Sequence, residues 1–375
     1  MKKSGANPIF QYIFGLFSGV WAANTYRLYS MPNRVENWIN VRVLRKHKKF
    51  HVVKKSEGKS RNLAIVALWP RMGILDSVVH EIEILLKLER EVICVLNKSK
   101  LSNAWIKHLE QYPITIISRE NIGRDFGAYQ SGVSYVSSEY GLSNIESLTL
   151  ANDTILFAKD SLEVIRETLN LPGDVKCIYL NLQTHLHAQS FFLVFTENVL
   201  KSRKFSKFWE SYYPSNERVH AINNGEVKLS KTLNKANFKF VSYLNSERLH
   251  EIFADFKPFS LSELGAIFDI SGATTEIRKR TYLSSDYHKL QAERILVSQN
   301  ASHLLGLYLF RVMSVPLKLD LMLRGFHSSS DLYEVLRTKG YSAEALSDYE
   351  SMLYKQGSWN TIRGIQVLWR KYGYI

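Results

Sequence analysis

The stretch from Arg119 to Gly132, RENIGRDFGAYQSG, decides the fold that the sequence predicts. It follows the β-branched apolar run 114–117, which Pro113 opens, and it leads into a helix-like segment, Ala128 to Val136. A strand, a glycine-rich turn and a helix in succession form the place where α/β folds bind phosphate. Glycine lets backbone amides approach an anion, and the helix N-terminus adds partial positive charge. The glycine spacing fits neither the dinucleotide fingerprint nor the Walker motif. A plain structural turn with an exposed ion pair is the alternative.

Strand-like and helix-like segments alternate on both sides of that stretch. Strands are predicted at 63–69, 91–97, from Ile114, and at 147–150, 175–182 and 190–195, with helices at 74–90, 102–111, 128–139 and 197–212. This alternation predicts an α/β fold with a mostly parallel sheet flanked by helices. Ligands bind such sheets at the carboxyl ends of the strands, where 121–125 falls. Beyond about Phe256 the strand pattern fades into a largely helical C-terminal region.

A second polar motif ends another apolar strand at Asn152 and Asp153. Amide and carboxylate oxygens together can hold a divalent cation or accept hydrogen bonds from sugar hydroxyls. The motif offers few carboxylate ligands for a cation, because Asp153 is the one clear candidate and Asp160 is a possible second ligand. The alternative is an Asx-type cap that opens a turn.

Further candidates follow in the next part of the chain. Gln189 and Ser190 stand at the mouth of a predicted strand, which suits pocket residues that form hydrogen bonds. His185 and His187 point to the same side of an extended segment, but no third metal ligand lies near them in the sequence. Glu226 follows a predicted turn, Asn223 to Gly225, and opens a helix, where it is either favoured by the helix dipole or a catalytic carboxylate.

The bulk charge is strongly positive, 49 − 35 = +14, and much of it lies between Arg42 and Arg61. Such a block attracts polyanions, either anionic lipid or nucleic acid, unless it is a solvated linker. The aromatic segment from Ile9 to Ala23 precedes it and suits a helix at a membrane surface or one docked on the protein.

Cys94 and Cys177 lie in apolar strands, which predicts buried, reduced thiols and a cytosolic compartment. We therefore divide the chain into a membrane-associating arm (1–60), a catalytic domain (61–255) and a helical region (256–375).

Three motifs together resemble the rhamnan synthesis F family of bacterial polysaccharide glycosyltransferases. They are the segments 121–129, 150–154 and 187–195, and Glu226 stands where the family has an acidic residue before a helix. The resemblance spans roughly 61–243. Two departures are Trp69-Pro70, where a His is expected after the first strand, and Thr154 in place of the usual Ser.

The resemblance implies a GT-A-like domain that binds a nucleotide-sugar, typically dTDP-L-rhamnose. It also implies an inverting transfer to a growing lipid-linked glycan, an O-antigen or rhamnan, at the cytoplasmic face of the inner membrane. The expected partners are therefore the donor, this acceptor and an anionic membrane surface. No nucleic-acid partner is expected, because the chain shows no recognition motif for one. The alternative function is a non-catalytic scaffold of a polysaccharide assembly complex.

The resemblance also assigns roles to the candidate residues. The predicted nucleotide-sugar-binding set is Asn121, Gly123, Arg124, Asp125, Gly127, Asn152, Gln189 and Ser190. Gly123, Arg124 and the helix after Gly127 would face the diphosphate, and Asp125 would bind the ribose or base. Asn152 and Asp153 would take the place of an Asp-x-Asp motif, with Asp153 as ligand if Mg²⁺ or Mn²⁺ is used. Either Asp153 or Glu226 would be the general base of an inverting transfer.

Overall fold

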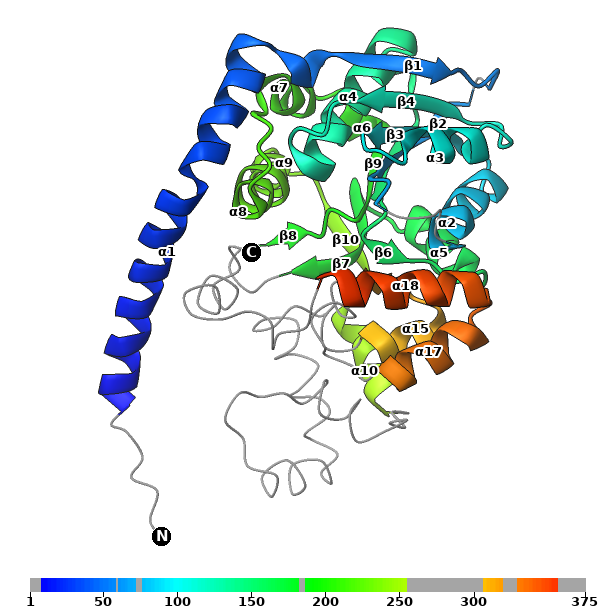
Figure 1. The fold of residues 1–375 in the computed structure, drawn as a ribbon. Coiled ribbons are helices and arrows are strands. Elements are labelled where there is room, and N and C mark those ends of the chain that lie inside the picture. The colour runs from blue at the N-terminus through cyan, green and yellow to red at the C-terminus, as the bar shows by residue number, and fades with distance from the viewer. Residues whose placement is uncertain are drawn as a thin grey trace.

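The computed structural model describes residues 8–58, 60–71, 76–181, 186–254, 306–319 and 329–356. Its centre is a nine-stranded sheet in the order β1-β4-β3-β2-β5-β9-β7-β10, with β8 paired to β7 (Figure 1). The strands are β1 (Phe50–Lys54), β2 (Asn62–Leu68), β3 (Glu91–Asn97), β4 (Thr115–Arg119), β5 (Ser147–Asn152), β7 (Val175–Asn181), β8 (His187–Ala188), β9 (Phe192–Thr196) and β10 (Phe240–Leu244).

The strand directions place most carboxyl ends at one edge of the sheet. β4, β3, β2 and β5 pair in parallel, and so do β7 and β10. β9 is antiparallel to both of its neighbours, β5 and β7, so those two run the same way. Six strands thus share one direction, against which β1, β8 and β9 run. The prediction of a mostly parallel sheet flanked by helices is confirmed.

The central strand β2 is buried on both faces, which explains its unbroken run of apolar residues. Leu63, Ile65 and Ala67 face one core and the alternate residues face the other, as the two-residue period of a strand requires. The first core lies under α4 (Arg124–Glu139), α7 (Arg203–Ser211) and α9 (Lys228–Asn234). The second lies under α2 (Asp76–Lys87), α3 (Ser102–Leu109) and α5 (Leu162–Asn170).

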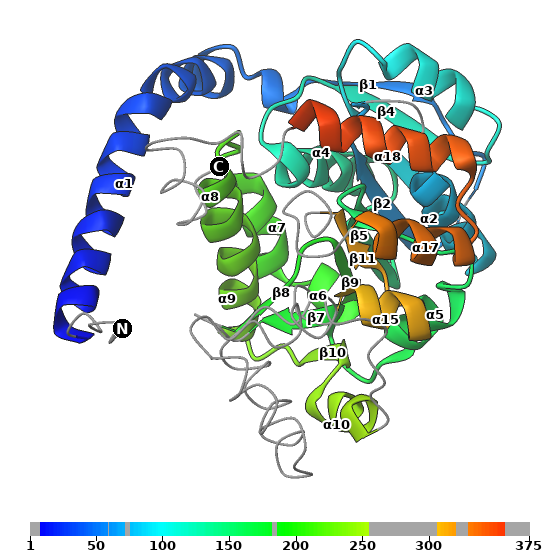
Figure 2. The same cartoon turned by 60° about the horizontal axis from the view of Figure 1, so that its bottom comes forward.

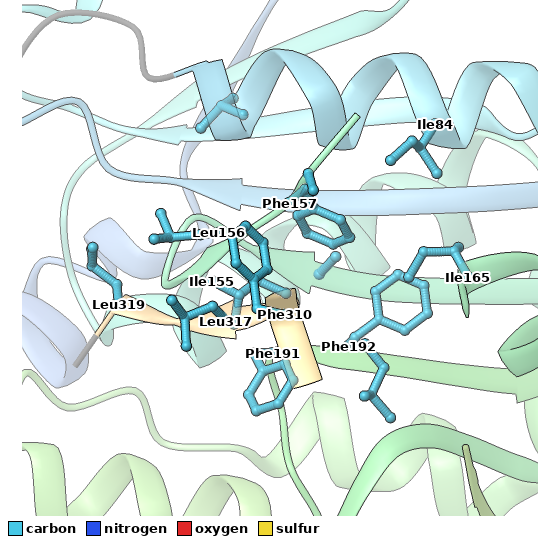
Figure 3. Packing of buried hydrophobic residues seen from close by; sticks show 14 of the residues in the cluster. Ile84, Ile155, Leu156, Phe157, Ile165, Phe191, Phe192, Phe310, Leu317 and Leu319 are labelled. Carbon is cyan, nitrogen blue, oxygen red and sulfur yellow. The ribbon is translucent and has the colours of Figure 1, made fainter. Parts of the chain in front are cut away.

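The C-terminal region completes the second core. Its described elements are α15 (Gly306–Met313), β11 (Leu317–Lys318), α17 (Ser329–Thr338) and α18 (Ala343–Gln356). β11 pairs with β6 (Ile155–Leu156), directly after the Asn152-Asp153 motif. Phe310 and Leu317 pack there against Leu156 and Phe157 (Figure 3). The region is therefore joined to the central sheet through shared apolar packing, and not only through the chain.

The N-terminal segment forms one long helix, α1 (Pro8–Trp38), followed by the turns η1 (Ile39–Val43) and η2 (Lys46–Lys48). Both views show α1 extending away from the sheet and joined to the body near its C-terminal end (Figures 1 and 2). Among the described residues, no helix combines the length and apolar character of a membrane span. The next strand, β1, pairs with β4, so the main domain begins at about Phe50 and not at residue 61.

Three local predictions differ from the structure. The helix expected from Ala128 begins at Arg124, so that Asp125 and Gly127 lie in its first turns. The single helix expected at 197–212 is two helices, α6 (Glu197–Leu200) and α7, because the Ser202 side chain accepts a hydrogen bond from the Phe205 amide and starts a new helix.

The third difference concerns Glu226. The turn expected at 223–225 is part of a widened helical segment, η4 (Ala221–Val227), which joins α8 (Arg218–His220) to α9. Glu226 lies inside this segment and not at a helix start. A Cβ on Gly225 would come within 2.7 Å of the Phe126 ring, so this glycine allows close packing of two elements. His185 lies outside the described residues.

The contact between α4 and β2 yields a stability prediction. A Cβ on Gly132 would lie 2.6 Å from Ile65 Cγ2, in the middle of the first core. Gly132→Ala should therefore lower the free energy of unfolding by about 1–3 kcal/mol through overpacking. The measurement is urea unfolding followed by circular dichroism.

The matched control for this prediction is Ser134→Ala, an exposed position of the same helix. Alanine favours the helix at both sites, so only Gly132→Ala should destabilise the protein. Equal or higher stability of the Gly132 variant would contradict the packing.

Candidate functional site

The start of α4 is built by close packing around two glycines. Gly123 has φ +87°, and a Cβ on it would meet Pro214 Cβ at 2.3 Å. A Cβ on Gly127 would lie 2.0 Å from the carbonyl oxygen of Ile122. The Gly123 amide donates to Asn216 Oδ1 at 2.6 Å, and Gly127 donates to the Gly123 carbonyl. Internal contacts thus account for both glycines, and these two amides already have acceptors.

The exposed donor at this turn is the side chain of Arg124. This residue has φ +53°, a left-handed conformation uncommon outside glycine, and it starts α4. Neighbouring Asn121 contributes its carbonyl oxygen, which accepts from Asn216 Nδ2 at 3.5 Å. A guanidinium beside a helix N-terminus attracts anions. If phosphate binds here, Arg124 is the group positioned to meet it.

The two polar motifs predicted from the sequence meet at the end of β5. Asn152 Nδ2 donates to the Tyr129 hydroxyl at 3.0 Å and lies 3.4 Å from Asp125 Oδ2. Its Oδ1 accepts from the Thr154 amide at 3.0 Å. Asn152 is buried, so one side chain connects the end of a central strand to α4 and also caps the next turn. The Asx-type cap considered as the alternative is therefore present, and the same side chain also contacts α4.

Asp153 is a buried carboxylate at the same edge of the sheet. Its side chain accepts from the Trp69 amide at 2.7 Å, and its own amide donates to the Ala67 carbonyl at 3.2 Å. Burial raises the pKa of Asp153 to about 6, and the negative charge of Asp125 adds to this, while Arg71 and the Trp69 amide oppose it. Asp153 therefore changes charge near neutral pH.

A second buried acid lies next to Asp153. Glu81, on α2, is 1% exposed and neither of its carboxyl oxygens has a hydrogen-bond partner. Burial raises its pKa well above the ordinary value, and the charge of Asp153 raises it further. Burial thus favours the protonated, uncharged form of Glu81. Sequence reasoning missed it, because a carboxylate beside an apolar stripe is ordinarily exposed; the signal is that Glu81 follows Val78 by three residues and precedes Leu85 by four.

A chain of hydrogen bonds continues from α4 to η4. The Tyr129 hydroxyl donates to the Ser190 carbonyl at 2.8 Å, and Ser190 Oγ donates to Glu226 Oε2 at 3.0 Å. His187 Nε2 lies 3.4 Å from Glu226 Oε1. Asp125, Asn152, Ser190 and Glu226 are therefore members of one polar network. The backbone of the predicted Gln189 also belongs to this region, since its amide donates to the Tyr179 carbonyl at 3.1 Å.

Tyr129 and His187 are members of this network that the site prediction omitted. Tyr129 follows Asp125 by four residues, so a helix beginning at Arg124 puts both on one face. The later helix start expected from the sequence hid this relation. His187 was considered as a metal ligand, but its partner in the structure is the carboxylate of Glu226.

The donor set for a divalent cation is small. The described residues contain no group of three or more His, Cys, Asp or Glu side chains arranged to hold a metal. Asp125 and Asp153 influence each other's charge across Asn152. Mg²⁺ is often bound by one or two carboxylates together with substrate phosphates. These two carboxylates fit a cation in that manner only, with a phosphate ligand completing the set.

The architecture and the polar edge define a class, an α/β protein with a mostly parallel sheet and its candidate site at the carboxyl ends of the strands. Residues 92–267 match the family model described as Rhamnan synthesis protein F. The resemblance found in the motifs is confirmed for this region, which contains every predicted site residue.

Among curated proteins, the chain is similar to the uncharacterized protein y4gN of Sinorhizobium fredii (strain NBRC 101917 / NGR234). The two are 26% identical over 215 residues, which are 56% of this chain and 55% of that protein. The chain thus spans about half the length of this relative.

Two solved structures show weak similarity at 10% identity. A cytidylyltransferase from Leptospira borgpetersenii serovar Hardjo-bovis (strain JB197) matches 50% of this chain and 77% of its own, with a TM-score of 0.29. A protein described as a nucleotide-diphospho-sugar transferase from Desulfovibrio desulfuricans G20 matches 62% of this chain and 99% of its own, with a TM-score of 0.30. Because these TM-scores are low, the fold is assigned from the strand order and strand directions of the sheet alone.

The raised pKa of Asp153 predicts a pH-dependent stability difference. Between the ordinary pKa near 3.8 and about 6, the folded protein keeps a proton that the unfolded chain has released. Stability therefore falls as the pH rises through this window. Asp153→Asn cannot ionise, so its stability relative to the native protein should rise across the window by up to about 3 kcal/mol. Urea unfolding at a series of pH values measures the difference, and a constant difference would contradict the burial of a titrating Asp153.

Proposed function

We propose that this protein is a glycosyltransferase that uses a nucleotide-sugar donor. The observation that carries the proposal is the buried polar network at the carboxyl edge of the sheet, inside the region that matches Rhamnan synthesis protein F. Edges of this kind are where α/β sheets bind their ligands. The network costs folding free energy, since each buried polar group needs a partner, and a binding site is a reason to keep it.

The finer proposal takes dTDP-L-rhamnose as the donor and a growing lipid-linked polysaccharide as the acceptor. Rhamnan synthesis in the name of the matched family supports rhamnose, and the resemblance to polysaccharide glycosyltransferases supports the lipid-linked acceptor. Transfer would then take place with inversion at the cytoplasmic face of the inner membrane.

The donor half of the site would lie at the start of α4. Transfer requires stabilisation of the leaving diphosphate. Arg124 would meet the phosphates, since the amides of Gly123 and Gly127 have acceptors already. Asp125 would accept hydrogen bonds from the ribose or base, because its carboxylate is only partly buried and lies beside the Asn152 amide. A cation, if used, would be held by Asp153 and Asp125 and would supply additional positive charge to the diphosphate.

Of the two candidate bases, Asp153 fits the chemistry better. A general base is most effective when its pKa lies near the working pH, and burial raises that of Asp153 to about 6. Both carboxylate oxygens of Glu226 have neighbours, Ser190 Oγ and His187 Nε2, so this residue is suited to holding those two groups in place. We therefore assign proton abstraction to Asp153 and a positioning role to Glu226.

Donor binding is tested by thermal unfolding. With dTDP-L-rhamnose at about a hundred times its Kd, the folded state should gain about 2.7 kcal/mol and the Tm should rise. Asp125→Ala should lose this rise, whereas Glu139→Gln, at the opposite end of α4, should keep it. Parallel samples with Mg²⁺, Mn²⁺ and EDTA test the cation. A rise with UDP-glucose and none with dTDP-L-rhamnose would reject the rhamnosyl donor while retaining a nucleotide-sugar site.

Transfer itself is tested by release of dTDP in the presence of lipid-linked acceptor. Asp153→Asn should lower kcat by about 10²–10⁴-fold, the usual contribution of a general base, while the donor-induced Tm rise measured in EDTA persists. Glu226→Gln should have a smaller effect. A larger loss of kcat in Glu226→Gln than in Asp153→Asn would identify Glu226 as the general base. A native protein that binds donor and never releases dTDP, with any rhamnan acceptor, would instead favour the non-catalytic scaffold.

A further inference from the structure

The helix α1 carries a stripe of exposed apolar side chains, interrupted at Asn24. Trp21, Leu28 and Val35 repeat every seven residues, so they lie on one face of the helix. Their neighbours on this face, at spacings of three and four, are Phe17, Val20, Met31 and Trp38. Leu28 is 72% exposed and Phe17 73% exposed. Soluble proteins rarely leave an apolar surface of this kind without a partner.

The opposite face of the same helix is the one that the protein covers. Ala22, Tyr26 and Ser30 follow one another at intervals of four residues and are buried, and Asn37 continues this face. Asn37 Nδ2 donates to the Pro214 carbonyl at 3.1 Å, which attaches the helix to the body. Arg34 adds a bidentate ion pair with Glu217. The helix is therefore fixed with its apolar stripe exposed. Figure 2 shows the helix lying beside the body.

Positive charge borders the stripe. Arg27 and Arg34 line one shallow groove of about 500 Å³ with Leu28, Met31, Val35 and Trp38. The segment 8–50 contains one acidic residue, Glu36, against seven basic ones: Arg27, Arg34, Arg42, Arg45, Lys46, Lys48 and Lys49. Most of these basic side chains are exposed, and several follow directly after α1. An apolar stripe with a basic border suits an interface between hydrocarbon and negatively charged head groups.

We infer that α1 is the surface by which this protein binds an anionic lipid membrane. The helix lies along the membrane with the stripe that contains Trp21, Leu28 and Val35 in the acyl boundary. Arg27 and the basic residues after α1 contact the head groups, and the aromatic rings suit the interfacial layer. A second copy of the chain would cover the stripe equally well, but it would bring an identical set of positive charges to the contact. Charge complementarity therefore favours lipid.

The test is co-sedimentation of the full chain with vesicles of phosphatidylcholine, with and without phosphatidylglycerol. The protein should bind the anionic vesicles and should be released by salt. Leu28→Gln combined with Val35→Gln should lower the partition coefficient at least about tenfold, because two apolar side chains no longer enter the membrane. Lys48→Gln combined with Lys49→Gln should lower it about 25-fold on anionic vesicles, about fivefold for each charge.

The matched control is Asn33→Gln, an exposed position about 140° around the helix from Leu28, and it should bind like the native chain. All substituted positions are exposed, so the variants should keep the native circular dichroism spectrum. Equal sedimentation of the native chain and the Leu28/Val35 variant would overturn the proposal. A dimer in light scattering that this variant dissociates, without vesicle binding, would assign the stripe to a second copy. Neither readout depends on sugar transfer, so a failure here leaves the donor-binding test untouched.

Discussion

The site depends on one buried amide, that of Asn152. Its donor group binds Tyr129 and approaches Asp125, and its oxygen accepts the Thr154 amide. A strand end, a helix and the following turn are thereby held in one arrangement. A buried amide is costly when unpaired and strongly directional when paired, so it fixes positions that apolar contacts leave free to shift. The remaining polar contacts, through Tyr129 and Ser190 to Glu226, extend from this point.

The carboxylates near this amide belong to a region of low polarity. Asp153 and Glu81 are both buried, and each responds to the charge of a neighbouring acid. Burial, together with the charge of a neighbouring acid, holds the pKa of Glu81 well above its ordinary value and raises that of Asp153 to about 6. Strongly shifted acids of this kind are frequent at functional sites, where a proton has to be held and released. The acids with shifted pKa values therefore lie in the same region of the protein as the hydrogen bonds of Asn152.

The C-terminal region contributes to the site indirectly. β11 pairs with β6, and the Leu319 amide donates to the Thr154 carbonyl at 2.9 Å. The Tyr341 hydroxyl donates to the Phe157 carbonyl at 2.7 Å. The segment after Asn152 and Asp153 is therefore held on one side by the sheet and on the other by residues more than 150 positions later in the chain. A boundary drawn near residue 255 separates parts that share one core.

The sequence by itself determined the sheet strands, because the runs at β2, β3, β5 and β7 are apolar and their period is local. It also determined that Asp125 and Asn152 would meet, since parallel strands bring their carboxyl ends to one edge. Only the tertiary structure showed that the segment around Gly225 is helical and that it packs against Phe126, nearly a hundred residues away, too closely for a Cβ to fit. It likewise decided the burial of Glu81 and the pairing of His187 with Glu226, because burial and long-range contacts depend on how distant elements pack and have no local pattern in the sequence.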